Sequence, residues 1–195
     1  MRSIPKVWMT GLVGVAIFAA SCSIGRIVGP GSKVHFDSWV TQDKRAEQLQ
    51  KFDRFLQSQG VADVAPAWTL WRQGTDWAEV GQPAFAVPPE KDWPAIIPTL
   101  KLLRDEVVPL VGDVEVVSAW RSSTYNSVAG GAASSRHLYF EAVDVQPERN
   151  WVRQDLHSTL LTRWRAIGPK TGWGLGLYER TRFHVDTHRH RKWGG

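Results

Sequence analysis

The chain has very little cysteine. Cys22 is the only one in 195 residues, so an internal disulfide is excluded. Long hydrophobic runs are also missing, because the apolar stretch from Val7 to Ala20 is shorter than the roughly 20 residues that a membrane-spanning helix needs. No internal repeat is present. The length, with an average share of hydrophobic and charged residues, predicts one globular domain with a real core.

Signatures of nucleic-acid and nucleotide binding are absent as well. Gly130-Gly131 is not followed by the Lys-Ser/Thr pair and helix that a phosphate-binding loop requires. The net charge is +5, and a basic surface suits an anionic polymer such as a cell wall, or a membrane, as well as a nucleic acid. We therefore expect no nucleic-acid partner. Basic residues gather near the C-terminal end, at Arg180, Arg182, Arg189, Arg191 and Lys192.

The N-terminal residues have the pattern of an export signal. Arg2 and Lys6 precede the apolar run, which ends in Ala19-Ala20-Ser21-Cys22. Small residues before a lone cysteine resemble a bacterial lipoprotein cleavage box. We expect residues 1–22 to be a lipoprotein signal peptide and Cys22 to carry a lipid that anchors the chain to the membrane. An ordinary cleaved signal or an uncleaved anchor is the alternative. The expected location is the cell envelope, in the periplasm, as an outer-membrane lipoprotein.

Residues 23–40 contain several glycines and a proline and are expected to be a tether, with the domain over 41–195. Within the domain, helical and alternating periodicities predict helices first and a small sheet afterwards, which favours an α+β fold. A glycine-rich segment covers 172–178. Helices are expected over 41–59, 95–108 and 151–167, strands over 114–118, 142–145 and 182–187, and irregular chain over 61–94 and 122–136.

His137, Asp144 and His184 form a candidate ligand set for a catalytic zinc, which typically takes three protein ligands and one water. A loop followed by a strand can bring His137 and Asp144 to one point, and His184 would come from a neighbouring strand. His188 is the alternative to His184, because it shares the same face if the strand continues. His188 and His190 could also extend a metal site, but a solvated basic tail is the preferred interpretation of both. His35 and His157 receive no role.

A base and a substrate contact are predicted beside these ligands. His184 and Asp186 share a strand face, which places a carboxylate near the metal. Zinc lowers the pKa of its bound water towards about 7, and a nearby carboxylate can accept that proton. Asp186 is the favoured base and Glu179 the second candidate. Arg121 follows a strand end, where its planar guanidinium can bind a substrate carboxylate or polarise a carbonyl.

Several motifs resemble those of the M15 peptidases, which are zinc D-Ala-D-Ala carboxypeptidases and murein endopeptidases related in fold to the hedgehog signalling domain. The resemblance covers residues 85–193. It rests on Arg121-Ser-Ser-Thr-Tyr-Asn126, Gly130-Gly131, Ser135-Arg-His137, Glu141-Ala-Val-Asp144 and His184-Val-Asp186.

The resemblance implies a hedgehog-like α+β fold with a small central antiparallel sheet flanked by helices. It implies zinc ligation by His137, Asp144 and His184, and a substrate contact at Arg121. The implied substrate is peptidoglycan, cleaved in its stem peptides or cross-links. The sequence does not distinguish carboxypeptidase from endopeptidase activity. An inactive peptidoglycan-binding envelope lipoprotein is the alternative function.

Five further positions carry specific expectations. Phe140 stands where many M15 relatives have glycine, and a bulky residue there could narrow the cleft or change the turn without removing a ligand. Asn126 and Ser135 are expected to contact the substrate backbone or to fix loop geometry. Most of the eleven tryptophans are expected to be core or rim anchors, and some could line a groove for a glycan or peptide. Trp173 and Trp193 either flank the cleft or pack in the core.

Overall fold

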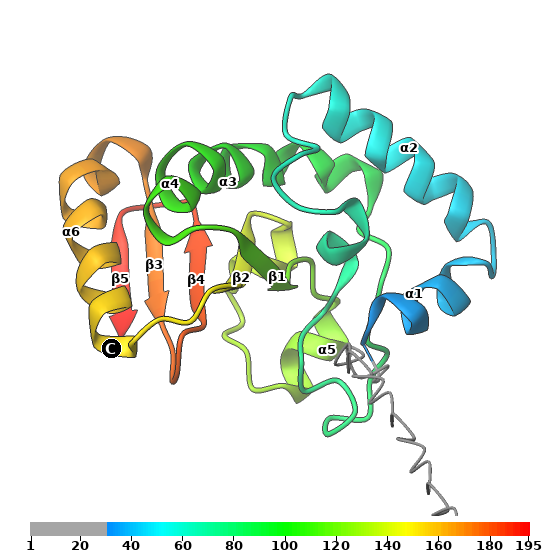
Figure 1. Cartoon of the computed structure of the whole chain (residues 1–195). Coiled ribbons are helices and arrows are strands. Elements are labelled where there is room, and N and C mark those ends of the chain that lie inside the picture. The colour runs from blue at the N-terminus through cyan, green and yellow to red at the C-terminus, as the bar shows by residue number, and fades with distance from the viewer. Residues whose placement is uncertain (1–30) are drawn as a thin grey trace, which may run out of the picture.

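The computed structural model describes residues 31–195, which form helices packed against a five-stranded sheet (Figure 1). The predicted signal peptide, Cys22 and the beginning of the predicted tether lie outside the described residues. Within residues 31–195, no helix is both long and apolar enough to cross a membrane.

Helix α1, Lys33–Val40, lies where the second half of a tether was expected. The Ser32 hydroxyl caps it by accepting a hydrogen bond from the His35 amide at 3.3 Å. Phe36 and Val40 are buried, and the Phe36 ring meets Phe85 edge-on at 5.1 Å. The tether prediction over 23–40 is therefore wrong for residues 33–40. The glycine and proline cluster ends at Gly31, and the aromatic residues after it join the core.

The helices that follow lie where the spacing of apolar residues predicts them, but one of them is not a regular α-helix. Helix α2, Arg45–Ser58, confirms the helix predicted over 41–59. The helix predicted over 95–108 is composite: a 3-10 turn η2 (Glu90–Ile96), α3 (Ile97–Leu102), a π segment η3 (Leu103–Val107) and α4 (Val108–Val111). In the π segment the Val108 amide donates to the Leu103 carbonyl. Pro109 follows directly, and its ring would crowd a regular helical turn. Helix α6, Arg153–Thr171, confirms the third prediction.

Two segments predicted as irregular contain short helical turns. Residues 61–94 include η1, Ala67–Trp71. Residues 122–136, predicted as a loop, begin with helix α5, Ser123–Val128, which the Ser122 hydroxyl caps by accepting from the Tyr125 amide at 3.2 Å. The turn η4, Arg136–Tyr139, then leads into the sheet. The loop prediction is thus wrong for α5, because a serine N-cap starts a helix in a sequence of small polar residues.

The sheet has the strand order β1-β2-β4-β3-β5. Strands β1 (Val114–Ser118), β2 (Ala142–Pro147) and β4 (Phe183–Asp186) confirm the predicted strands. Strand β3 (Gly174–Leu177) lies in the glycine-rich segment, and β5 (Arg191–Gly194) in the basic C-terminal stretch. The sheet is antiparallel as predicted, except that β3 and β5 run parallel. The α+β fold is confirmed, and His188 and His190 are exposed, as the interpretation of a solvated basic tail predicts.

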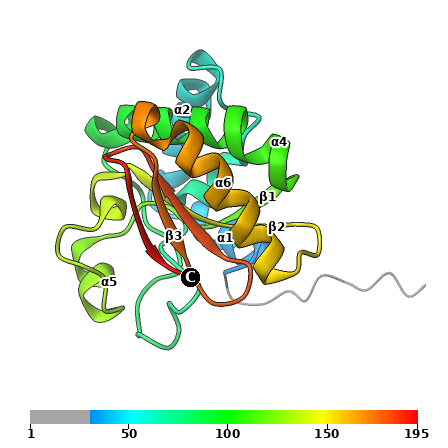
Figure 2. The ribbon, with the colours of Figure 1, turned by 90° about the vertical axis from the view of Figure 1, so that its left-hand side faces the viewer.

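The two faces of the sheet have different neighbours. Helix α6 packs against β3 and the α3–α4 region lies along the same side (Figures 1 and 2). Buried hydrophobic side chains alternate along the strands and form this core face. Asp144, His184 and Asp186 take the intervening positions, so they share the opposite face. The core-face residues include Val143, Val145, Leu175, Leu177, Phe183 and Val185.

Candidate metal centre

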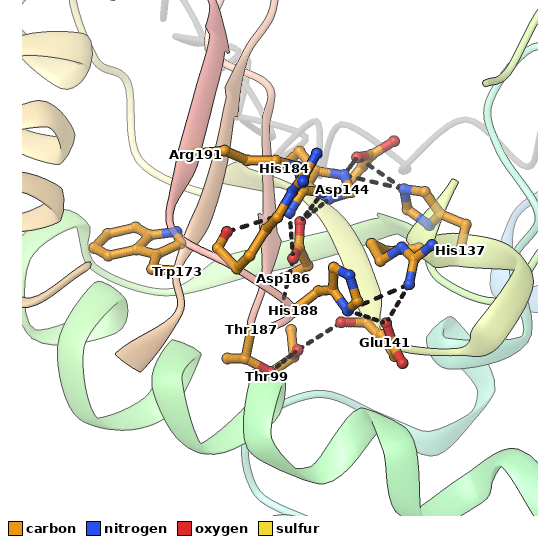
Figure 3. Close-up of polar contacts among 12 residues, drawn as sticks. Thr99, His137, Glu141, Asp144, Trp173, His184, Asp186, Thr187, His188 and Arg191 are labelled. Carbon is orange, nitrogen blue, oxygen red and sulfur yellow. Dashed lines mark hydrogen bonds and ion pairs between the residues drawn. The ribbon is translucent and has the colours of Figure 1, made fainter. Parts of the chain in front are cut away.

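Three buried side chains from different elements meet at one point (Figure 3). His137 lies on η4, Asp144 on β2 and His184 on β4. The Nε2 atom of His137 is 3.2 Å from Asp144 Oδ1 and 3.2 Å from His184 Nδ1. His184 Nδ1 is 2.9 Å from Asp144 Oδ1. The structure thus brings together the three predicted ligands and selects one atom of each.

The triangle of these atoms has the size that a zinc ion requires. Zinc bonds to nitrogen and oxygen of about 2.0–2.1 Å in a tetrahedral arrangement place neighbouring ligand atoms about 3.3 Å apart. The three observed separations, 2.9–3.2 Å, are close to that value. Two imidazoles and one carboxylate are also a donor set that catalytic zinc sites use. The residues present therefore fit zinc.

Strand register places Asp144 and His184, because they are direct partners in the antiparallel pair β2–β4. His137 is fixed from outside the sheet. Its Nδ1–H donates to the Ala119 carbonyl at 2.6 Å, which leaves Nε2 free of a proton and aimed at the other two ligands. Burial lowers the pKa of His137 to about 4, so its ring is neutral as a metal ligand requires.

Arg121 holds the other oxygen of Asp144. Its Nη2 donates to Asp144 Oδ2 at 2.7 Å, while Nε donates to the Gln73 carbonyl and the Ser118 hydroxyl, both at 2.9 Å. Burial opposes ionisation of Asp144, but the adjacent His137 and His184 outweigh it and hold its pKa well below the usual range. The predicted substrate contact is therefore also a positioning residue for a ligand.

Asp186 lies behind His184, as seen from the ligand triangle. Its Oδ2 is 3.0 Å from His184 Nε2, on the other side of the ring from Nδ1. Arg191 binds both of its oxygens, at 3.0 and 2.8 Å, and the His188 amide donates to Oδ1 at 2.9 Å. Burial disfavours its charge, but the bonds from His184 and Arg191 outweigh this and lower its pKa. The shared strand face of His184 and Asp186 is confirmed, and the carboxylate orients the ring.

Two glycines of β3 leave room for these groups. Gly176 is opposite His184 and Gly174 is opposite Asp186 in the β3–β4 pair. A Cβ on Gly176 would lie 2.6 Å from the Trp193 ring and 2.9 Å from His184 Cβ. A Cβ on Gly174 would clash with Asp186 Oδ2 and Arg191. The alternation of Gly and Leu in β3 therefore puts the site on one face and the core on the other.

A cleft of about 350 Å³ opens over the triangle. Trp193 borders it, with its ring centroid 4.9 Å from that of His184. Of the two positions left open for both tryptophans, Trp193 thus has the flanking one, and Trp173 is fully buried in the core. Among the described residues that line the cleft, none is a carboxylate. The polar and charged lining residues are Arg121, Ser134, Ser135, Arg136, His137, Tyr178, His184 and Arg191.

The other predicted site residues lie at different distances from this centre. Ser135 lines the cleft. Asn126 is buried, does not line it, and donates to the Ala132 carbonyl at 3.0 Å, which fixes the loop. Glu179 is exposed in the turn after β3. His188 is nearly half exposed beside Arg136 and Glu141, and it does not join the triangle, so of the two histidines His184 is the one in place to bind a metal.

Phe140 turns away from the cleft. Its backbone is left-handed, with φ 56°, a conformation that favours glycine. The side chain is fully buried in the core, where its ring lies 5.9 Å from that of Phe52. The turn between His137 and Asp144 is therefore kept, and the cleft is not narrowed. The glycine that many relatives have at this position is explained by the backbone conformation.

Sequence reasoning missed three contributors to the site. Tyr178 ends the glycine-rich segment, and its hydroxyl is 3.4 Å from Asp144 Oδ1. Arg191 belonged to the basic stretch near the C-terminus but forms an ion pair with buried Asp186. The third is the backbone carbonyl of Ala119, for which no residue-type signal exists. For Tyr178, its place directly after a short alternating run was an available signal.

Comparison with known families gives one finding. The family model described as Peptidase M15 matches residues 59–186, which is more than half of the chain and includes the whole ligand triangle. No curated protein and no solved structure matches the chain. Together with the fold and the triangle, the match shows that this chain belongs to the peptidase M15 family.

Proposed function

We propose that the chain is a zinc peptidase that hydrolyses peptide bonds in peptidoglycan stem peptides or cross-links. The observation that carries the proposal is the triangle of His137, Asp144 and His184, sized for zinc and open to a cleft. A bound zinc ion would activate a water molecule and polarise the scissile carbonyl. Membership of a peptidase family supports the reaction class.

The residues around the triangle would keep the ligands ready for the metal. The Ala119 carbonyl holds His137 in the tautomer that exposes Nε2, and Asp186 does the same for Nδ1 of His184. Arg121 fixes the outer oxygen of Asp144, so that Oδ1 stays turned to the centre. Such bonds around metal ligands orient them and raise metal affinity.

The charge of the cleft supports an anionic peptide as the substrate. Arg121, Arg136 and Arg191 line it, with no carboxylate among the described lining residues. Peptidoglycan stem peptides carry free carboxylates, which guanidinium groups bind with paired hydrogen bonds. Ser135 and the Trp193 ring would contact the peptide beside them.

We revise the assignment of the catalytic base, for which the sequence favoured Asp186. Asp186 has both oxygens engaged and lies behind His184, so we assign it to orienting the ring. Glu179 follows the cleft residue Tyr178 directly and remains the candidate base. A Glu179→Gln variant with full activity at saturating zinc would remove that assignment.

The test combines metal analysis with product identification. The purified chain should bind one zinc and release new muropeptides from peptidoglycan, identified by mass spectrometry. His137→Ala and Asp144→Ala should abolish both zinc content and cleavage, and cleavage by either variant would refute the proposal. Release of D-Ala would indicate a carboxypeptidase, and opened cross-links an endopeptidase. Binding to peptidoglycan without new products would favour the inactive binding protein instead.

We further propose that the enzyme is an envelope lipoprotein, held at the outer membrane by a lipid on Cys22. The basic residues, apolar run and small residues before Cys22 support this location. Cys22→Ser should release the protein from the membrane fraction. Mass spectrometry should find acyl chains on the wild-type protein and none on this variant. A wild-type chain without lipid would refute the anchor.

A further inference from the structure

Tyr178 and Arg121 contact different oxygens of Asp144. It is the first residue after β3, and its hydroxyl donates to Asp144 Oδ1 at 3.4 Å. That oxygen is also the one within 3.2 Å of His137 Nε2 and 2.9 Å of His184 Nδ1. The hydroxyl therefore adjoins the ligand triangle itself, on the side that faces the cleft.

The surroundings of the ring keep the hydroxyl in this place. The Tyr178 amide donates to the Arg182 carbonyl at 3.2 Å, which closes the turn between β3 and β4. The Arg182 guanidinium lies over the Tyr178 ring, 5.0 Å from its centroid, and also donates to Thr75 Oγ1 at 3.2 Å. The tyrosine is held at its backbone and its ring, so that its hydroxyl is the end free to change partner.

We propose that Tyr178 is a catalytic residue whose hydroxyl donates a hydrogen bond to the carbonyl oxygen of the scissile peptide. Asp144 Oδ1 would be a ligand in the metal-loaded site, and the Tyr178 hydroxyl would then turn from it to the substrate oxygen. The bond strengthens as that oxygen gains negative charge during attack. Tyr178 keeps its proton throughout, so no group is transferred to or from it. This role rests on the proposed peptidase function.

A purely structural role for the same contact predicts a different outcome. Arg121 already holds Asp144 with a charge-assisted bond of 2.7 Å, which is shorter and stronger than the 3.4 Å contact from Tyr178. Loss of the Tyr178 hydroxyl should therefore leave the ligands in place. Metal affinity separates the two roles, since positioning would change it and donation to the substrate would not.

The experiment compares Tyr178→Phe with Tyr139→Phe in the full chain. Tyr139 is 49% exposed, and its hydroxyl makes no hydrogen bond among the described residues, so the same chemical change there is a matched control. Three quantities are measured: the zinc Kd by competition with a chelator, kcat and KM on a purified muropeptide, and the Kd of a phosphinate peptide that mimics the tetrahedral state. Thermal unfolding verifies that both variants fold.

For Tyr178→Phe we expect a zinc Kd within about twofold of the wild type and a kcat lower by about 10²–10³, the usual effect of removing one such donor. KM should change little, and the phosphinate should bind more weakly by a similar factor, because both losses arise in the tetrahedral state. Tyr139→Phe should match the wild type in all three quantities.

Other outcomes overturn the inference. If the wild-type chain cleaves the muropeptide and the Tyr178→Phe variant is equally active, the role of Tyr178 is refuted and the proposed function stands. A tenfold weaker zinc Kd with kcat restored at saturating zinc would show that Tyr178 only positions Asp144. A wild-type chain that binds zinc but cleaves no muropeptide would refute the proposed function and, with it, this role.

Discussion

His137 and His184 present one ring nitrogen each to the same point, but different groups hold the second nitrogen. His137 donates to a backbone carbonyl, and we call this pair the Ala119 arm. His184 contacts Asp186, which Arg191 binds in turn, and these three residues form the Asp186 arm. Burial lowers the pKa of His137 to about 4. Burial also opposes the charge on His184, but its bonds to Asp144 and Asp186 outweigh this and raise its pKa.

The difference indicates how each arm can fail. A backbone carbonyl cannot be removed by substitution, and burial keeps His137 neutral, so the Ala119 arm is preset. The Asp186 arm depends on side chains from β4 and β5 and on the space that β3 leaves for them. Substitutions should therefore disturb metal binding mainly through the Asp186 arm.

The largest effect is expected for Gly174→Ala. The added methyl group would occupy the place of Asp186 Oδ2 and Arg191, so the arm must move. We expect zinc affinity to fall more than 100-fold and unfolding to become easier by about 1–3 kcal/mol, as for other overpacked sites. Leu175→Ala, on the core face, should cost about 2–5 kcal/mol but keep zinc affinity. Zinc titration and urea unfolding of both variants test this, and tenfold or smaller loss in Gly174→Ala would contradict it.

Asp186→Asn should have the next largest effect. The amide keeps the shape but loses the charge that binds Arg191 and favours the Nε2–H tautomer of His184. Loss of such a partner typically costs 10–100-fold in metal affinity, which competition with a chelator would measure. If Asp186 were instead the base, the variant would bind zinc normally and lose only kcat.

The pH dependence of the metal-free protein should show both arms. An unfolded histidine has a pKa of about 6.5. Because the folded pKa of His137 is lowered to about 4, only the unfolded state takes up that proton between these values, and stability falls as pH decreases through this window. The raised pKa of His184 has the opposite sign: its contribution is complete below pH 6.5 and is lost as pH rises through the folded pKa.

Urea unfolding at a series of pH values would measure both limbs. Between about pH 4 and 6.5, His137→Gln should flatten the fall in stability. His184→Gln should flatten the alkaline limb, and it should also change the profile below about pH 4, because His184 helps to lower the pKa values of Asp144 and Asp186. Unchanged profiles in both variants would contradict the assignment of the two shifts.

The smallest effect on zinc affinity is expected for Phe140→Gly. Glycine relieves the left-handed backbone at this position, but a buried aromatic ring is lost from the core. The loss of the ring dominates, so the variant should be less stable by about 2–4 kcal/mol, with zinc affinity unchanged. A weaker zinc Kd in the folded variant would show that the ring supports the ligand turn.

The cluster of His137, Asp144 and His184 and much of the fold could be predicted, because they depend on local patterns. Alternation along β2 and β4 gave the faces of Asp144 and His184, and the spacing of apolar residues gave α2 and α6. Strand β5 could not be predicted. Its four residues are mostly basic or glycine, and it exists because it pairs in parallel with β3.

The hydrogen bonds that orient the candidate ligands could not be predicted from the sequence, for a different reason. The Arg121–Asp144 ion pair follows from the β1–β2 register, in which Ser118 is opposite Asp144. The Ala119 carbonyl is a backbone group that every residue carries, so its role cannot be predicted from residue type. The base prediction favoured Asp186 because period-2 spacing gives a shared face, but spacing alone does not say on which side of the His184 ring the carboxylate lies.

The Trp193 ring beside His184 has a kinetic consequence. The indole covers part of the His184 ring, and Gly176 gives it the space to do so. A chelator or an exchanging ion would therefore reach the centre through the cleft that Tyr178, Ser135 and Trp193 line. Retention of the metal would then depend on how slowly it escapes as well as on how tightly it binds, and the last strand of the sheet would set its residence time.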